Sequence, residues 1–97
     1  MATPAPASVQ RRDDALAFAG VLSRDAVPGL WQQALRALDG ARRLDLSQVA
    51  AVDSAGLALL VELAARAGGL AVHGDPPGLD GLRKAYRLSP SLTFAQA

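Results

Sequence analysis

Hydrophobic residues recur along this chain with two different periods, and the period changes at clusters of turn-forming residues. Residues 15–22 alternate between two sides, with side chains of modest size on both. A period of two predicts a strand. The preceding residues 8–14 can form a hairpin partner for this strand, with the turn near Asp13 and Asp14.

Between Ser23 and Gly40 the period lengthens to that of a helix. Apolar residues recur there every three or four positions, which is typical of an amphipathic helix. Ser23 or Asp25 can cap this helix, and Pro28 is compatible with its first turn. Trp31 lies on the stripe and is interpreted as a core residue. The stripe comprises Val27, Leu30, Trp31, Ala34, Leu35 and Leu38.

The chain after Gly40 repeats the alternation of strand and helix. Residues 42–47 predict a short strand, and residues 47–52 are expected to form a loop that leads to Asp53. A second helix begins at Ser54 and is closed by Gly68 and Gly69. The remaining elements are a short buried strand over 70–74, a turn over 75–78, a helix over 79–88 ended by Ser89 and Pro90, and a short tail over 91–97.

The order of these elements predicts an α/β fold. Strands that alternate with helices favour a small, mixed but largely parallel sheet with right-handed crossovers and helices packed mainly on one face. Sites in such sheets lie at the carboxyl ends of strands, where loops lead into helix N-termini. Asp53 and Ser54 occupy one of these junctions.

The second helix carries little charge on the side that faces away from its expected core. Leu57, Leu60, Val61 and Ala64 share the core face, and only Glu62 and Arg66 are charged elsewhere on the helix. Helix propensity alone can explain the alanines. A docking face is the alternative, in which small side chains admit a partner and an exposed Leu59 or Leu63 supplies an apolar anchor.

Ser54 also admits several interpretations. Asp53 or Ser54 can cap the helix, while the helix dipole there favours an anion, including a phosphate carried by Ser54 itself. Nucleophilic catalysis is disfavoured because the sequence lacks a G-x-S-x-G turn and offers only His73 as a base. On the last helix, Arg83, Lys84 and Arg87 form either a solvated face or a contact for an acidic partner or lipid surface.

Composition narrows the possible functions. The chain has 97 residues, which we expect to form a single domain over 1–97 with a flexible N-terminal tail at 1–7. A net charge of +1 gives no basic stripe for nucleic acid. With no cysteine and one histidine, neither a metal site nor a cofactor is expected. No segment has signal-peptide character or membrane-spanning length, which predicts a cytoplasmic protein.

Three stretches resemble one family. "LDLS" followed by "VDSAGLALL" (Val52–Leu60) resembles the STAS domain, named after sulfate transporters and anti-sigma factor antagonists. "LAFAGVLSRDAVPGLW" and "LRKAYRL" are similar to segments of the MlaB type within that family. The resemblance covers about residues 15–88, and it implies the same fold. Ala55 stands where anti-sigma factor antagonists more often carry a second Ser or Thr.

The resemblance implies a non-catalytic cytoplasmic subunit, peripheral on the inner membrane, of an ABC transporter that moves phospholipid between membranes. Its partner would be an MlaF-like ATPase in a complex with permease and periplasmic lipid-binding subunits. An anti-sigma factor antagonist phosphorylated at Ser54 is the alternative. The expected partner-binding residues, combining this resemblance with the helix face, are Asp53, Ser54, Ala55, Gly56, Ala58, Leu59 and Glu62.

Overall fold

One four-stranded sheet forms the centre of the molecule, for which a computed structural model describes residues 7–89 and 92. The sheet order is β1-β2-β3-β4. β1 runs antiparallel to β2, while β2, β3 and β4 are parallel, so the expected mixed, largely parallel sheet is confirmed. The strands are β1 (Ser8–Arg12), β2 (Ala15–Leu22), β3 (Arg43–Val52) and β4 (Ala71–His73).

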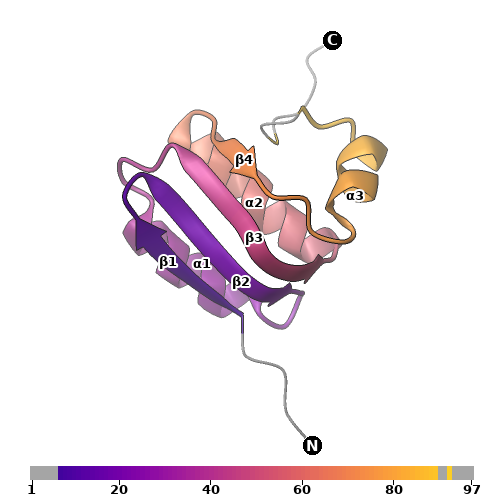
Figure 1. The fold of residues 1–97 in the computed structure, drawn as a ribbon, viewed down its shortest axis with the longest axis horizontal. Coiled ribbons are helices and arrows are strands. Elements are labelled where there is room, and N and C mark those ends of the chain that lie inside the picture. The colour runs from indigo at the N-terminus through magenta and orange to yellow at the C-terminus, as the bar shows by residue number, and fades with distance from the viewer. Residues whose placement is uncertain (1–6, 90–91, 93–97) are drawn as a thin grey trace, which may run out of the picture.

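Three helices complete the fold: α1 (Val27–Ala37), α2 (Ser54–Ala67) and α3 (Leu79–Ala85). The parallel strands follow one another in a single direction across the sheet, so right-handed crossovers carry α1 and α2 to the same face. Figure 1 shows both helices behind the sheet and α3 beside it, next to the end of β3. The predicted one-sided packing of helices is therefore confirmed.

The hydrophobic core lies between the sheet and the two long helices. β2 supplies Leu16, Phe18 and Leu22, and β3 supplies Leu44 and Leu46, all of them at most 1% exposed. The predicted hairpin is also confirmed, with its turn at Asp13 and Asp14. Of the expected flexible tail, residues 1–6 lie outside the described part of the chain, whereas Ala7 is half-buried and packs against the core.

β3 is longer than predicted, because the segment expected to be a loop continues the strand to Val52. Two irregularities in the register with β2 allow the strand to continue. At the first of them, Asp45 Oδ1 accepts hydrogen bonds from the Ser47 hydroxyl at 2.7 Å and the Ser47 N–H at 3.0 Å. These bonds, the hydroxyl first, lower the pKa of Asp45. Bulges carry no period-two signal, which is why the pattern missed this half of the strand.

Three other boundaries differ from expectation. Neither Ser23 nor Asp25 caps α1 with its side chain; the Ser23 carbonyl instead accepts from the N–H groups of Ala26 and Val27. β4 is an edge strand whose exposed residues flank a half-buried valine, and the buried residue Leu70 precedes it. α3 ends before the predicted stop, at Ala85, where the following residues turn through a left-handed position.

The chain after α3 returns to the core. Leu88 is 5% exposed and Leu92 is 1% exposed, and both belong to the same buried cluster as the sheet residues. Arg87 between α3 and Leu88 has a φ of 55°, which turns the backbone sharply after the helix. Pro90 and all of the predicted tail 91–97 except Leu92 lie outside the described residues.

Candidate partner-binding site

The junction between β3 and α2 is organised by Asp53, the N-cap of the helix. Its Oδ1 accepts the Gly56 N–H at 2.8 Å, and its Oδ2 accepts the Arg24 N–H at 3.1 Å. The backbone N–H of Asp53 donates to the Leu22 carbonyl at 3.2 Å. One side chain thus ties the start of α2 to the loop that precedes α1. Of the two candidate caps, the structure selects Asp53.

Hydrogen bonding keeps the Asp53 carboxylate ionised. The Gly56 N–H is the largest cause of its lowered pKa, and the Arg24 N–H adds to it. Both donors stabilise only the charged form. Asp53 therefore acts as a fixed negative charge at the positive end of α2, where the helix dipole favours it.

Gly56 brings α2 into direct contact with the end of β2. A Cβ atom at this position would lie 2.2 Å from the Leu22 carbonyl oxygen, closer than any side chain can approach. Gly56 is buried, so its role is packing and not contact with a partner at the surface. Gly56 was expected among the partner-binding residues, and its burial gives it a packing role within the fold.

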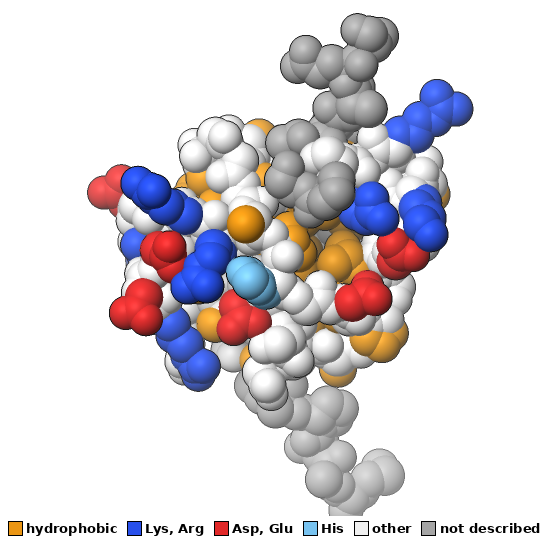
Figure 2. Space-filling model, turned by 45° about the horizontal axis from the view of Figure 1, so that its top comes forward, with side chains coloured by type: hydrophobic (Ala, Val, Ile, Leu, Met, Phe, Trp, Pro, Cys, Tyr) orange, Lys and Arg blue, Asp and Glu red, His pale blue; other side chains and the backbone are white. Residues whose placement is uncertain are grey.

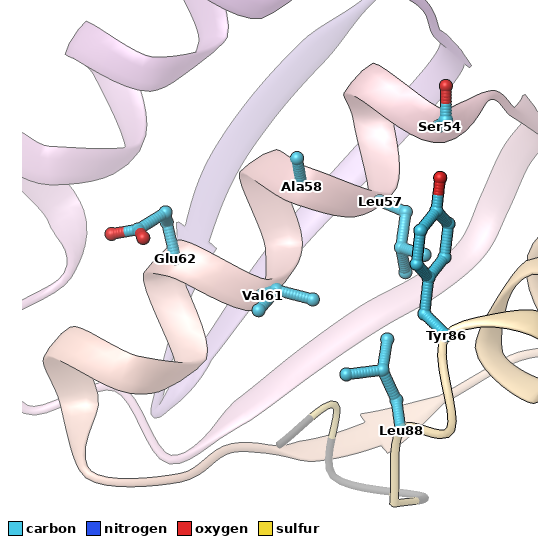
Figure 3. Close-up of a pocket in the computed structure, with 7 residues that line it drawn as sticks. All are labelled: Ser54, Leu57, Ala58, Val61, Glu62, Tyr86 and Leu88. Atoms are coloured by element: carbon cyan, nitrogen blue, oxygen red, sulfur yellow. The ribbon is translucent and has the colours of Figure 1, made fainter. Parts of the chain in front are cut away.

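The exposed side of α2 carries a strip at i, i+4 and i+8 formed by Ser54, Ala58 and Glu62, here called the α2 strip. All three residues are exposed, and Ala55 beside them is half-buried. In Figure 3 the Ser54 hydroxyl points away from the helix at one end of the strip, while Glu62 lies at the other. Of the predicted partner-binding residues on α2, these three are therefore accessible at the surface.

Beside the strip runs an open groove of about 270 Å³, here called the α2 groove. One wall is α2 and the other is the segment that follows α3 (Figure 3). Tyr86 on the second wall is 51% exposed, an unusual exposure for an aromatic side chain. The lining residues are Ser54, Leu57, Ala58, Val61, Glu62, Tyr86 and Leu88.

The predicted apolar anchors are absent from this surface. Leu59 is 3% exposed and Leu63 is fully buried, because α2 packs against α1 as well as the sheet. Contact with two neighbours widens the buried arc beyond the single face that the helical period suggested. Val61, which was assigned to the core, is half-buried and lines the groove instead.

Tyr86 and Leu88 are the site residues that the sequence interpretation missed. Both lie in "LRKAYRL", the segment already noted for its resemblance to the MlaB type. Tyr86 falls within the longer helix that was predicted over residues 79–88. An aromatic residue directly after the last residue of a short helix was the available signal, but only the structure places it opposite α2.

An arginine on α2 lies over the tryptophan of α1. The Arg66 guanidinium carbon is 5.1 Å from the centroid of the Trp31 ring. This is a cation–π distance, and it connects the two helices across their shared surface. Trp31 is half-buried, so it borders the core that it was expected to occupy.

The basic residues in and directly after α3 differ in their surroundings. Asp80 forms ion pairs with Arg83 at 3.0 Å and with Lys84 at 3.1 Å, and these bonds, with Lys84 first, lower its pKa. Arg87, which is exposed between Tyr86 and Leu88, takes no part in the ion pairs found among the described residues. The solvated-face interpretation therefore fits Lys84, whereas Arg83 is half-buried and also donates to the Leu88 carbonyl at 3.3 Å.

His73 lies far from Ser54. It pairs with Asp45 in the sheet register, whereas Ser54 follows Val52 at the opposite end of β3. At about 3.3 Å per strand residue, roughly 20 Å separate the two ends. The structure therefore offers no serine–histidine pair at this site. In Figure 2, acidic and basic side chains interleave on one side of the histidine, to its left in this view.

The described residues form neither a metal site nor a membrane-spanning helix. No group of three acidic, histidine or cysteine side chains there is arranged to hold a metal ion. Among the helices of the described ranges, none has the length and apolar character needed to cross a bilayer.

Comparison with known proteins adds three findings. A family model described as "Mlab, STAS domain" matches residues 7–92. The intermembrane phospholipid transport system binding protein MlaB of Escherichia coli K12 and that of Shigella flexneri are each 44% identical to this chain over 50 residues. The match spans 52% of this chain and 52% of each relative, so it covers about half the length of the curated relatives.

A solved structure supports the fold. The anti-sigma factor antagonist SpoIIAA in its unphosphorylated form aligns with a TM-score of 0.57 over 94% of this chain and 89% of that one. Its sequence identity is 18%, so the likeness concerns the architecture alone. The sheet with helices on one face is thus shared with a protein of known structure.

Proposed function

The chain belongs to the family of MlaB-type STAS domains, and we propose that it is a non-catalytic subunit that binds and supports the ATPase of an MlaFEDB-like ABC transporter for phospholipid. The name of the similar MlaB proteins, a binding protein of intermembrane phospholipid transport, supports this proposal. The ATPase would be MlaF-like and would join permease and periplasmic lipid-binding subunits. The chain would then be cytoplasmic and peripheral on the inner membrane.

The α2 strip is the observation that carries the proposal. Ser54, Ala58 and Glu62 are exposed on a helix whose start is fixed by Asp53 and Gly56. A rigid helix with small side chains allows a partner to approach closely without a large loss of side-chain entropy. The surface is therefore suited to docking a folded partner.

The proposed mechanism is a shift of the ATPase equilibrium. A subunit that binds one state of its partner more tightly populates that state in proportion to the difference in affinity. Docking along the α2 strip would favour the assembled or closed form of the ATPase. No residue of this chain takes part in hydrolysis in this mechanism.

Co-purification with the ATPase tests the docking surface. Ala58→Arg introduces a long charged side chain in the middle of the strip, and we expect at least about a tenfold loss of affinity. Ser54→Asp is expected to abolish co-purification while the helix stays folded, because its N-terminus tolerates an acid. Gln32→Arg on the solvent side of α1 is the matched control and should bind normally. Normal binding by both strip variants would exclude this surface.

A phosphorylation switch at Ser54 is the second candidate function. Its support is the exposed hydroxyl at the start of a helix of 14 residues, where the dipole favours a phosphate. In that case the chain would be an anti-sigma factor antagonist. Intact-mass measurement of protein isolated from cells should then detect a phosphate on wild-type protein and none on Ser54→Ala. Absence of the modification across growth conditions would remove this candidate.

A further inference from the structure

Most of β3 is paired with a strand on one side only. β4 pairs with Arg43–Asp45, so residues 46–52 have β2 on one side and no strand of the described residues on the other. This stretch, here called the β3 edge, reads "LSQVAAV" and contains no charged residue, proline or glycine. Uncharged segments of this length pair readily with strands of other chains when they lie at an open edge. An uncovered β3 edge would therefore be prone to association between chains.

The segment that follows β4 runs along this edge before the chain enters α3 (Figure 1). It comprises residues 74–78, here called the strap. At its start, a Cβ atom on Gly74 would lie 2.8 Å from the backbone of Leu46 and Ser47. Gly74 also has a φ of 98°, a conformation that favours glycine. The missing side chain thus lets the strap lie directly against the backbone of β3.

The far end of the strap is held against the last residue of β3. The Val52 N–H donates to the Pro77 carbonyl at 3.1 Å, and a Cβ atom on Gly78 would lie 2.5 Å from the Val52 carbonyl oxygen. Pro76 is buried beside these contacts in the sequence. Neither proline has a backbone N–H, so the strap cannot donate to a further strand at these two positions.

We propose that the strap protects the β3 edge from pairing with a strand of another chain. Its glycines allow it to lie against the edge, and its prolines prevent it from extending the sheet. The two outer edges of the sheet are protected in other ways, because β4 has three residues and β1 ends in Arg11 and Arg12. This protection is a property of the folded chain alone and does not rest on the proposed function.

Displacing the strap tests its role. Gly74→Ala combined with Gly78→Ala places Cβ atoms where the backbone of β3 lies, so the strap should move away while β3 stays paired with β2. Gly69→Ala is the matched control, because Gly69 has a φ of 113° but a Cβ atom there meets no atom within 4 Å. By sedimentation equilibrium, the association constant of the double variant should exceed that of the control at least about tenfold. Hydrogen exchange of the Val52 amide, expected to be faster, reports the release of the strap.

A charge on the β3 edge separates strand pairing from other modes of association. Ala50 lies within this edge and is exposed. Ala50→Lys, added to the double alanine variant, should return its association constant to that of the control, because a charged side chain disfavours pairing at a strand edge.

A second pair of substitutions loosens the strap without adding an atom next to β3. Pro76→Gly with Pro77→Gly frees two φ angles and keeps both carbonyl groups. We expect faster exchange of the Val52 amide and an association constant raised at least about threefold. Circular dichroism establishes that each variant is folded, and the proline variant decides if the alanine variant is not.

Three results would overturn the protective role. Folded variants with a faster-exchanging Val52 amide could associate no more than Gly69→Ala, which would mean that the β3 edge needs no cover. The Val52 amide could stay as protected in the variants as in the control, which would mean that the glycines and prolines do not hold the strap in place. Association that Ala50→Lys leaves unchanged would show that the chains meet at another surface.

Discussion

Asp53 makes the start of α2 sensitive to acid. Its pKa is lowered from the ordinary value of 3.8, first by the Gly56 N–H, so the folded state binds its proton less readily than the unfolded chain. A group with a lowered folded pKa contributes stability that is fully present above its unfolded value and is lost as pH falls through the folded pKa. The contribution of Asp53 should therefore begin to fall below about pH 3.8 and be lost as pH falls further, through the lowered pKa of the folded state.

Thermal unfolding between pH 7 and pH 2 measures this contribution. Asp53→Asn keeps a capping oxygen, so we expect stability near that of wild type at pH 7 and a smaller loss in acid. Asp53→Ala removes the cap and should lower the melting temperature already at pH 7. Asp75→Asn, which removes the same charge from the exposed turn before α3, is the control. An acid loss in Asp53→Asn equal to that of wild type would contradict the assignment.

Gly56 is the position where the addition of one carbon should be most harmful. A Cβ atom would lie 2.2 Å from the Leu22 carbonyl oxygen, and the neighbour is backbone that cannot rotate away. We expect Gly56→Ala to cost at least about 1–3 kcal/mol in the free energy of unfolding. Gly29→Ala on α1 meets no atom within 4 Å and should stabilise by about 0.4–1 kcal/mol. Urea unfolding of both variants provides the comparison.

Sequence patterns at the residue scale identified the right stretch but not the role of each position. Asp53 and Ser54 were alternative caps, and only the hydrogen bonds to Asp53 decided between them. Gly56 and Leu59 belonged to the expected surface, yet both are buried. Which side of a helix is covered depends on all of its neighbours, and a sequence does not state how many there are.

At the scale of elements, the bounds of α2 were predicted well from the sequence, whereas those of β3 were predicted poorly. The end signals of α2 are local, an acid before Ser54 and a left-handed glycine at Gly68, so its bounds follow from the sequence. β3 depends on bulges against β2, which are pairings between distant residues. The α2 groove depends on the path of the chain after α3, and its second wall was unpredictable for the same reason.

The contact between α1 and α2 can be tested through Trp31, the only tryptophan of the chain. Arg66→Ala removes the cation 5.1 Å above its ring, and we expect a loss of about 0.5–1 kcal/mol in the free energy of unfolding. The fluorescence maximum of Trp31 should shift to the red as water reaches the ring. Arg42→Ala, at another exposed position, should leave both measurements near wild type. An unchanged spectrum in Arg66→Ala would argue against the contact in solution.

At the scale of the whole molecule, the order of the parallel strands places both long helices on the same face of the sheet. α1 and α2 cover one face, and the carboxyl end of β3 delivers the chain to the α2 strip. The α2 strip lines the α2 groove, so a partner that docks on the strip also covers the groove.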